Sequence, residues 1–437
     1  MFVEPLGLPM LVGRVAIASA ALTHALFATF IVGSSLIGAM METIGYLRHD
    51  AAYERLARFI AFTLILTTAA ISFFGVILVF LLNIFWPHFW STLFRIMFWP
   101  LLLEASFFFG EAVFAYAWYY SWDWSTHDRL RKRWHLGFGW GAAACSLIAM
   151  LMIDIVASYM LTPRLPDQMW QTIFNPTMLY LDTHRIVGNL TWTGFGLAAL
   201  CALAFLRSHR EEDYHFYRWA GAVCFTIGFG ALLVMPAIGY QYLLELRYVE
   251  PQAFYTLMLG PRSWLFNLVA LLYGSIAVLG SVYILRNVRS SAQSDGHLII
   301  AGSLAVLIVA GLLFAMPYHV QHVPLLSGLT DAAINPLGKM QPNKYFAISA
   351  LVFFGLLNWV LFLRSFGGSS SWWKQAVADR QDRVNQRLLV MVAGCAIVMM
   401  LSMGWVRETA RAYNGYLIYG LMTFADEQSS YERKMTP

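Results

Sequence analysis

Residues 59–86 read FIAFTLILTTAAISFFGVILVFLLNIFW, a run of 28 residues without a charged side chain. A stretch of about 20 apolar residues is long enough to cross the hydrocarbon core of a bilayer as an α-helix. The run is continuous and lacks the period-two alternation of a half-buried strand, so a helix is expected. Residues 59–86 therefore predict a transmembrane helix.

The rest of the chain repeats this pattern. Of its 437 residues, 59% are hydrophobic and only 12% are charged, whereas soluble domains carry about 25% charged residues. This composition excludes a cytosolic enzyme, a nucleic-acid-binding protein and a disordered chain. It predicts an all-α polytopic membrane protein, with one membrane domain over residues 1–437. The ten segments expected to span the bilayer are 12–46, 57–86, 90–120, 136–161, 177–206, 216–243, 263–285, 297–318, 344–364 and 387–405.

Basic residues alternate between the two sets of connections. The connections after the first, third, fifth, seventh and ninth spans carry seventeen Lys and Arg residues, and the four between them carry six. Cytoplasmic loops are enriched in Lys and Arg, so the N-terminus is predicted to lie outside. The first apolar segment has no charged n-region before it, and we expect it to be a span rather than a cleaved signal peptide.

The cysteines give no sign of a covalent framework. Cys145, Cys201, Cys224 and Cys395 all lie in apolar runs, and no two of them form a CxxC pair. This spacing predicts buried thiols rather than disulfides, a zinc site or a covalently attached c-type haem.

Ionisable side chains inside a bilayer cost about 2.5–3.5 kcal/mol or more, so each is a functional hypothesis. The candidates are His24, Glu42, Glu104, Glu111, Asp154, Asp182, His184, Arg185, His319 and His322. The four histidines fall in the predicted outer half of the membrane. Histidines at one depth on different helices can hold a metal or a haem iron. Hydrogen-bonded core histidines are the alternative.

The carboxylates suggest a path for protons. Glu104 and Glu111 are seven residues apart and share one helix face, which suits either a proton relay or hydrogen bonds between helices. Asp154, in the next span, could extend such a path. Glu42 lies near the inner end of the first span and fits either the inner mouth of the path or an interfacial charge.

Three stretches together resemble subunit I of the cytochrome bd-type quinol oxidases, over about residues 10–245. ALTHALFATFIVGSSLIGAMMET (21–43) resembles the family's first helix, and FWPLLLEASFFFGEAVFAY (98–116) its third. NPTMLYLDTHRIVGNLTWTG (175–194) resembles its fifth, in which Asn-Pro precedes a histidine. The three motifs occur in the family's order.

The resemblance implies roles for five of these residues. His24 corresponds to the ligand of the active-site haem, and His184 to the ligand of a low-spin haem b. Glu104 and Glu111 correspond to carboxylates that serve the haem d site and its protons, although the second spacing is one residue shorter here. Glu42 corresponds to the glutamate of the Met-Glu-Thr at the end of the first helix.

The chain departs from this family after the sixth span. The family's long quinol-binding loop is essentially missing from residues 239–262, and the seventh span has no methionine to ligate the low-spin haem. Met258, Asn267 or a five-coordinate iron are the alternatives. Where the family has a glutamate at the end of the eighth helix, this chain reads MPYHVQHVP (316–324), so His319 or His322 could replace it as an iron ligand.

The C-terminal part ends with an additional helix and an outer tail. Residues 10–245 are expected to form the haem-binding core, 246–366 divergent spans, and 367–437 an inner linker, a tenth helix and the tail. MGWVRETARAYNGYLIYG (403–420) resembles the tail of bd-like proteins that lack the quinol loop. Glu408 and Arg411 there suit haem propionates, a partner protein, or an interfacial charge pair.

The predicted function is a haem-bearing subunit of a bd-like oxidoreductase of the bacterial or archaeal cytoplasmic membrane. It would reduce O₂ to water and carry two or three haems. Haem b is the expected type, and haem d is the alternative type. Electrons would come from a periplasmic cytochrome c or multihaem protein, and the resemblance implies a second hydrophobic subunit or a paralogue. The alternative is a haem b electron-transfer or anchor subunit without oxygen chemistry. A transporter is disfavoured because no paired broken helices indicate an inverted repeat.

Overall fold

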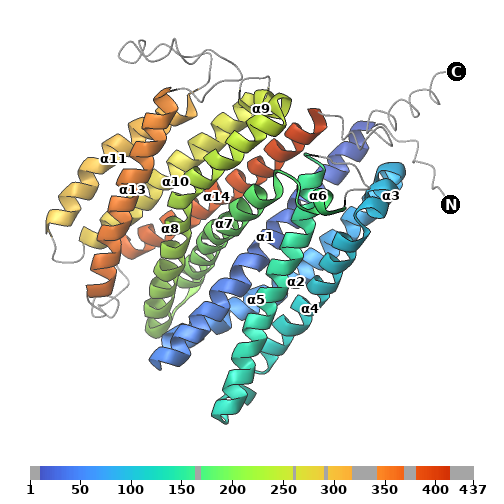
Figure 1. Ribbon diagram of the computed structural model, residues 1–437. Coiled ribbons are helices and arrows are strands. Elements are labelled where there is room, and N and C mark those ends of the chain that lie inside the picture. Colours follow the sequence, from blue (N-terminus) through green and yellow to red (C-terminus); the bar gives the residue numbers. More distant parts are fainter. Residues whose placement is uncertain are drawn as a thin grey trace. The chain divides into compact units, whose positions relative to one another are not determined.

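The computed structural model describes residues 10–162, 169–258, 262–289, 294–316, 342–368 and 380–413 (Figure 1). Within these ranges the regular structure is helical, and ten of the helices are long and apolar enough to cross a membrane. The prediction of an all-α bundle with ten spans is confirmed. The chain divides into two compact units, which are described separately below.

The first unit comprises Met1–Arg185, Leu244–Ala253 and Arg407–Pro437. Its helices α1, α2, α4 and α5 pack along one another, with α1 against both α2 and α5, and α4 against both α2 and α5 (Figure 1). Its elements are α1 (Met10–Arg48), α2 (Ala51–Phe85), α3 (Pro87–Ile96), α4 (Phe98–Tyr120), η1 (Trp124–Thr126), α5 (Arg129–Tyr159), α6 (Met169–Ile173) and the first turns of α7 (Met178–Arg207).

The connection between α1 and α2 is a tight reversal with its own capping residue. His49 adopts a left-handed φ of 53°, which turns the chain out of α1. Asp50 follows in an extended conformation, and its side chain accepts a hydrogen bond from the main-chain nitrogen of Ala52. Such an N-cap satisfies one of the free donors of α2. The two helices are therefore antiparallel neighbours.

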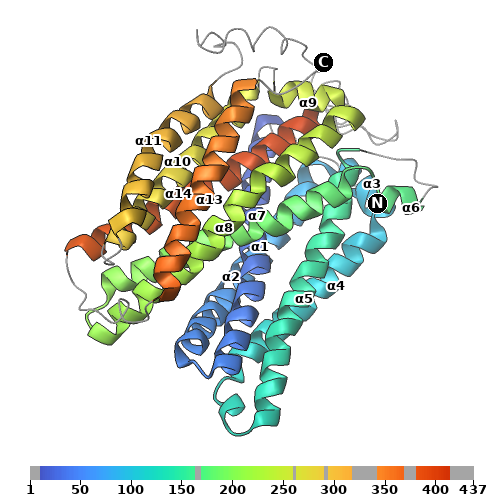
Figure 2. The ribbon, with the colours of Figure 1, turned by 60° about the vertical axis from the view of Figure 1, so that its left-hand side comes forward.

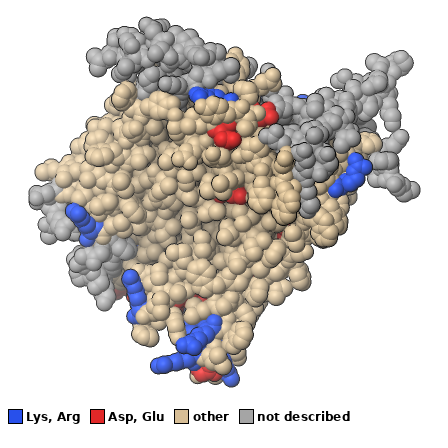
Figure 3. Space-filling view, viewed as in Figure 1, with Lys and Arg blue, Asp and Glu red and all other residues tan. Residues whose placement is uncertain are grey.

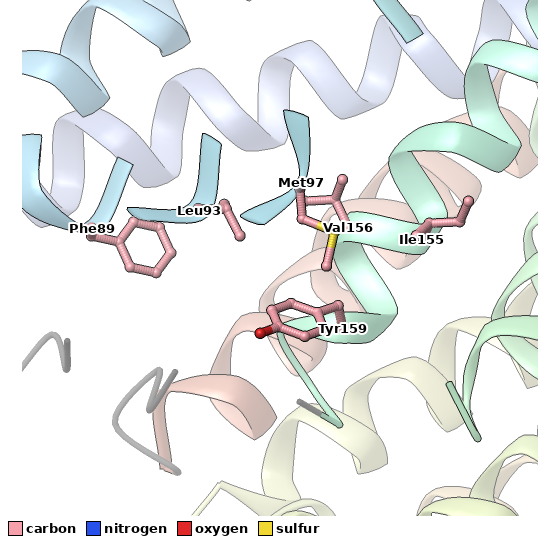
Figure 4. Close-up of a cluster of buried hydrophobic side chains, with 6 residues drawn as sticks. All are labelled: Phe89, Leu93, Met97, Ile155, Val156 and Tyr159. Carbon is pink, nitrogen blue, oxygen red and sulfur yellow. The ribbon is translucent and has the colours of Figure 1, made fainter. Parts of the chain in front are cut away.

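The third predicted span, 90–120, is two helices rather than one. Helix α3 ends at Ile96 and α4 begins at Phe98, with Met97 between them outside helical geometry. Apolar residues continue across the break, but Pro100 in the first turn of α4 has no main-chain N–H to donate to Ile96, which disfavours one continuous helix. Tertiary packing also holds this region, since α3 and Met97 form a buried cluster with the end of α5 (Figure 4). The cluster consists of Phe89, Leu93, Met97, Ile155, Val156 and Tyr159.

The second unit comprises Ile186–Leu243 and Phe254–Val406. Helices α10, α11 and α13 stand side by side and pack on one another in turn (Figure 2). Besides the rest of α7, its elements are most of α8 (Glu211–Val249), most of α9 (Pro251–Met258), α10 (Ser263–Arg289), α11 (Ser294–Ala315), α13 (Pro342–Gly368) and most of α14 (Arg380–Tyr413).

Glycines allow two close helix contacts in the second unit. A Cβ atom on Gly194 of α7 would lie 2.5 Å from the main-chain nitrogen of Gly228 on α8. A Cβ atom on Gly274 of α10 would lie 2.8 Å from the Cα atom of Gly311 on α11. Small residues at such crossings let backbones approach and gain van der Waals contact, which drives helix association in membranes.

Several helices extend beyond their predicted apolar segments. Helix α2 begins at Ala51 rather than at residue 57, and α5 begins at Arg129 rather than at residue 136. Their polar first turns are stabilised by Asp50 and Asp128, which cap the two helices. The described part of the face shown in Figure 3 is mostly tan, with only a few Lys, Arg, Asp and Glu side chains on it.

Candidate functional site

His24 lies in the middle of α1 and faces α2. A Cβ atom at Gly75 of α2 would come within 3.1 Å of the His24 Cε1 atom, so the imidazole packs directly on this glycine. The ring also lies beside the main-chain carbonyl of Ile71, one turn earlier on α2. Its Nδ1 atom is shielded from solvent and makes no hydrogen bond to any residue that the structure describes.

A buried charge cluster lies at the start of α7. Arg185 donates a hydrogen bond to Asp154 of α5, and the pair forms a salt bridge. Asp154 is fully buried, and the Asp182 carboxyl group lies beside it. Arg407 of α14 lies within electrostatic reach of Asp154. The structure thus places Asp154 in an ion pair.

Arg185 links the two histidines that the sequence singled out on α1 and α7. It directly follows His184 in the chain, and it lies within electrostatic reach of both His184 and His24. His184 is half-buried, and its Nδ1 atom is shielded from solvent. The cluster therefore brings His24, His184 and a fixed cation into one region of the first unit.

Glu104 and Glu111 lie on α4. Glu111 is 2% exposed, and its Oε1 atom has no hydrogen-bond partner among the described residues. Glu104 is half-buried and within electrostatic reach of Glu111. Cys145 of α5 adjoins this site, since its Sγ atom would lie 3.2 Å from a Cβ atom on Gly110. An uncommitted buried carboxyl group of this kind can take up or release a proton.

Glu42 is enclosed in a network of donors from α4 and α5. Trp118 Nε1 donates to Glu42 Oε2 at 2.6 Å, and Lys132 Nζ lies 2.8 Å from Oε1. His135 Nε2 lies 3.1 Å from Oε1, while the other ring nitrogen of His135 is 2.8 Å from Ser121 Oγ. Glu42 is 0% exposed, so it is not a solvated interfacial charge within this chain.

Sequence reasoning missed most of these partners. The sequence places Lys132 among loop charges and gives no role to His135 and Trp118, because His135 lies in a basic stretch just before the predicted span 136–161. Arg185 and Asp182 were recognised as intramembrane charges without an assigned function. Their partners are more than twenty residues away in sequence, and only the fold reveals them.

The remaining candidates fall in the second unit or outside the described residues. Met258 is the last residue of α9 and is half-buried. Asn267 Oδ1 accepts a hydrogen bond of 3.2 Å from Lys344 Nζ, which also donates to the Phe314 carbonyl. His319, His322 and the side chains of Glu408 and Arg411 lie outside what the structure describes.

A family model for cytochrome bd terminal oxidase subunit I matches residues 12–257, more than half of the chain. The chain belongs to this family. The match covers the region in which His24, Glu104 and His184 were predicted from resemblance to the same family.

Two curated bd-family proteins of Bacillus subtilis (strain 168) are similar to the chain. Cytochrome bd ubiquinol oxidase subunit 1 is 23% identical over 252 residues, covering 55% of this chain and 52% of that protein. A putative cytochrome bd menaquinol oxidase subunit I is 26% identical over 216 residues, covering 47% of each. The chain thus matches only about half the length of these curated relatives.

A solved structure of the bd oxidase from Geobacillus thermodenitrificans shares the fold. It aligns with a TM-score of 0.51 at 17% identity, covering 92% of this chain and 98% of that chain. Together with the ten apolar helices, the family places this bd subunit I in a bacterial cytoplasmic membrane as a multi-pass protein.

Subunits I of the bd family bind haems, and the residues around His24 fit such a group. A haem-ligating histidine offers one ring nitrogen to the iron and commonly directs the other toward a carbonyl or carboxylate. His24 has an uncommitted buried nitrogen and lies beside the Ile71 carbonyl. Within the described residues no cluster of three or more His, Cys, Asp or Glu side chains could hold a metal ion by itself.

Proposed function

We propose that this chain is the haem-bearing subunit of a terminal oxidase that reduces O₂ to water with electrons from an outer cytochrome or multihaem protein. The observation that carries the proposal is that His24 and His184 both lie within electrostatic reach of Arg185, within the region matched by the bd subunit I family. Haem bound at these histidines supplies the one-electron and oxygen chemistry, and the helices supply ligands, protons and a dry environment.

His24 and His184 are the proposed iron ligands in the first unit. Each is shielded, and each comes from a different helix, so the bundle can fix two rings independently. Met258, His319 and His322 stay candidates for further ligands, and Arg411 for a propionate contact. We propose two or three haems of type b. Haem d is the alternative haem type at the active site.

The proposed proton carriers are Glu104 and Glu111. Their carboxyl groups are close enough to influence each other, and Glu111 has an oxygen without a partner among the described residues. Asp154 and Glu42 are candidates for other points on the path. Each is in an ion pair and can take up a proton only by giving up part of that pair.

The short connection between α8 and α10 supports an outer electron donor other than quinol. Helix α8 ends at Val249 and α10 begins at Ser263, with the eight-residue α9 between them. This leaves no room for a long quinol-binding segment at that point. The second candidate, an electron-transfer subunit without oxygen chemistry, rests on the same connection and on the lack of a methionine in α10.

We also propose a second hydrophobic subunit as a partner. Large apolar side chains of α2 and α4 are exposed in this chain, including Phe73 at 63%, Val76 at 71% and Phe109 at 71%. In a membrane they can face lipid or another apolar helix. Copurification of an affinity-tagged chain from mild detergent would identify such a subunit.

The test is haem extraction with a reduced-minus-oxidised spectrum of the purified complex, repeated under carbon monoxide. We expect His24→Ala to abolish the carbon-monoxide-sensitive signal and His184→Ala to remove a different, insensitive haem. His127→Ala, at an exposed position after η1, is the matched control and should leave both signals. Haem signals that are all insensitive to carbon monoxide would instead favour the electron-transfer subunit.

A further inference from the structure

The Arg185–Asp154 pair is a charge arrangement inside the bundle, and the proposed chemistry gives Asp154 only a candidate place on the proton path and Arg185 none. Asp154 is 0% exposed, and it forms a salt bridge with the Arg185 guanidinium. Isolated charges inside a low-dielectric bundle are costly, and burying a pair of this kind is seldom favourable for stability alone. The pair therefore calls for a functional explanation.

Two features fix the guanidinium in place. Its bond to Asp154 ties α7 to α5, and its position directly after His184 keeps it close to that histidine. The side chain also lies within electrostatic reach of His24 on α1. A single cation thus stands near two histidines from two helices.

We propose that Arg185, held by Asp154, is a shared electrostatic positioning charge that favours the reduced state of both haems bound at His24 and His184. Adding one electron to a haem adds one negative charge, and a nearby fixed cation stabilises that charge. Electrostatic interactions are strong in a low-dielectric interior. This inference rests on the proposed function, because it takes the two histidines as haem ligands.

Asp154 has the opposite effect in this arrangement. Its carboxylate holds the cation in position and offsets part of its charge. Asp182, beside Asp154, and Arg407, within reach of it, are the other charged groups of this cluster. Removing Arg185 should therefore make both haems harder to reduce, and removing the Asp154 charge should make them easier to reduce.

The test is an optical redox titration of the purified complex with its haems in place. We expect lower midpoint potentials for both haems in Arg185→Gln, higher ones in Asp154→Asn, and near-wild-type values in Arg185→Lys, which keeps the charge. Arg131→Gln is the matched control, because Arg131 forms a surface pair with Asp128 on the same helix as Asp154. It lies roughly 35 Å from Asp154 along the α5 axis at 1.5 Å per residue, and its removal should leave both potentials unchanged.

Opposite shifts separate this role from a structural one, because a general loosening of the site would move both variants in the same direction. Unchanged potentials, shifts of one sign in both variants, or a shift confined to one haem would overturn the inference. If Arg185→Gln does not fold, Asp154→Asn decides alone, and its potentials must rise. Full haem content in His24→Ala and His184→Ala would instead overturn the proposed function, independently of any result at Arg185.

Discussion

At the scale of single residues, the least expected feature is the enclosure of Glu42. Two donors, Trp118 and Lys132, and the ring of His135 meet one carboxylate that solvent does not reach. Removing one member of a buried ion pair costs about 3–5 kcal/mol. Without Glu42, Lys132 would keep only the more exposed Glu54, and the Trp118 Nε1 donor would lose its acceptor. We therefore expect Glu42→Ala to lower the thermal unfolding temperature of the purified protein strongly, as measured by fluorescence in detergent.

Glu54 provides the control for this prediction. It also pairs with Lys132, at 3.3 Å, but its side chain is 35% exposed. Partly solvated pairs contribute about 0–1 kcal/mol, so Glu54→Gln should change the unfolding temperature little. Equal losses in the two variants would show that burial does not set the importance of Glu42.

The sequence predicted the candidate residues of the site better than their surroundings. His24, Glu104 and His184 follow from motifs and from depth along apolar segments. The neighbours of Arg185 could not be predicted, because Asp154 is 31 residues away in sequence and helix packing alone decides which side chains meet. The pairing of Glu42 with Lys132 could not be predicted either, because the basic run that contains Lys132 predicts only a cytoplasmic loop.

At the scale of elements, the crossing of α7 and α8 depends on two glycines. A Cβ atom on Gly194 would lie 2.5 Å from the nitrogen and 2.6 Å from the Cα of Gly228. Main-chain atoms cannot rotate out of the way as a side chain can, so the two helices must move apart. Overpacking of this kind costs about 1–3 kcal/mol. We expect Gly194→Ala to reduce the thermal stability of the purified protein.

A second glycine of α8 serves as the matched variant. A Cβ atom at Gly239 would meet nothing within 4 Å, and alanine favours a helix over glycine by up to about 1 kcal/mol. Gly239→Ala should therefore leave stability unchanged or raise it slightly. Loss of stability in Gly239→Ala comparable to that in Gly194→Ala would argue against the close crossing as the cause.

Helix identity was predictable from the sequence, whereas helix ends were not. Long apolar runs fixed the number of spans because backbone groups in lipid must pair within each segment. Capping by Asp50 and Asp128 extends α2 and α5 into polar sequence. Pro100 marks the break at Met97 in the sequence, whereas the cluster that packs this region on α5 is seen only in the fold.

At the scale of the whole molecule, the distribution of basic residues predicts that the N-terminus lies outside. Ser91 of α3 should then be on the outer side, and His209, between α7 and α8, on the inner side. In a chain whose four native cysteines are replaced, we expect an impermeant maleimide to label Ser91→Cys in intact cells. His209→Cys should be labelled only after permeabilisation, and the reverse pattern would invert the topology.

The Glu42 network also sets a condition on biogenesis. Trp118 is 76 residues and Lys132 is 90 residues beyond Glu42 in the chain. During synthesis α1 therefore enters the membrane with its carboxylate unmatched, and it stays so until the ribosome has completed α4 and the first turn of α5. A nascent chain stopped before residue 129 holds a charged first helix without its ionic partner Lys132 and should be a ready substrate for membrane quality-control proteases.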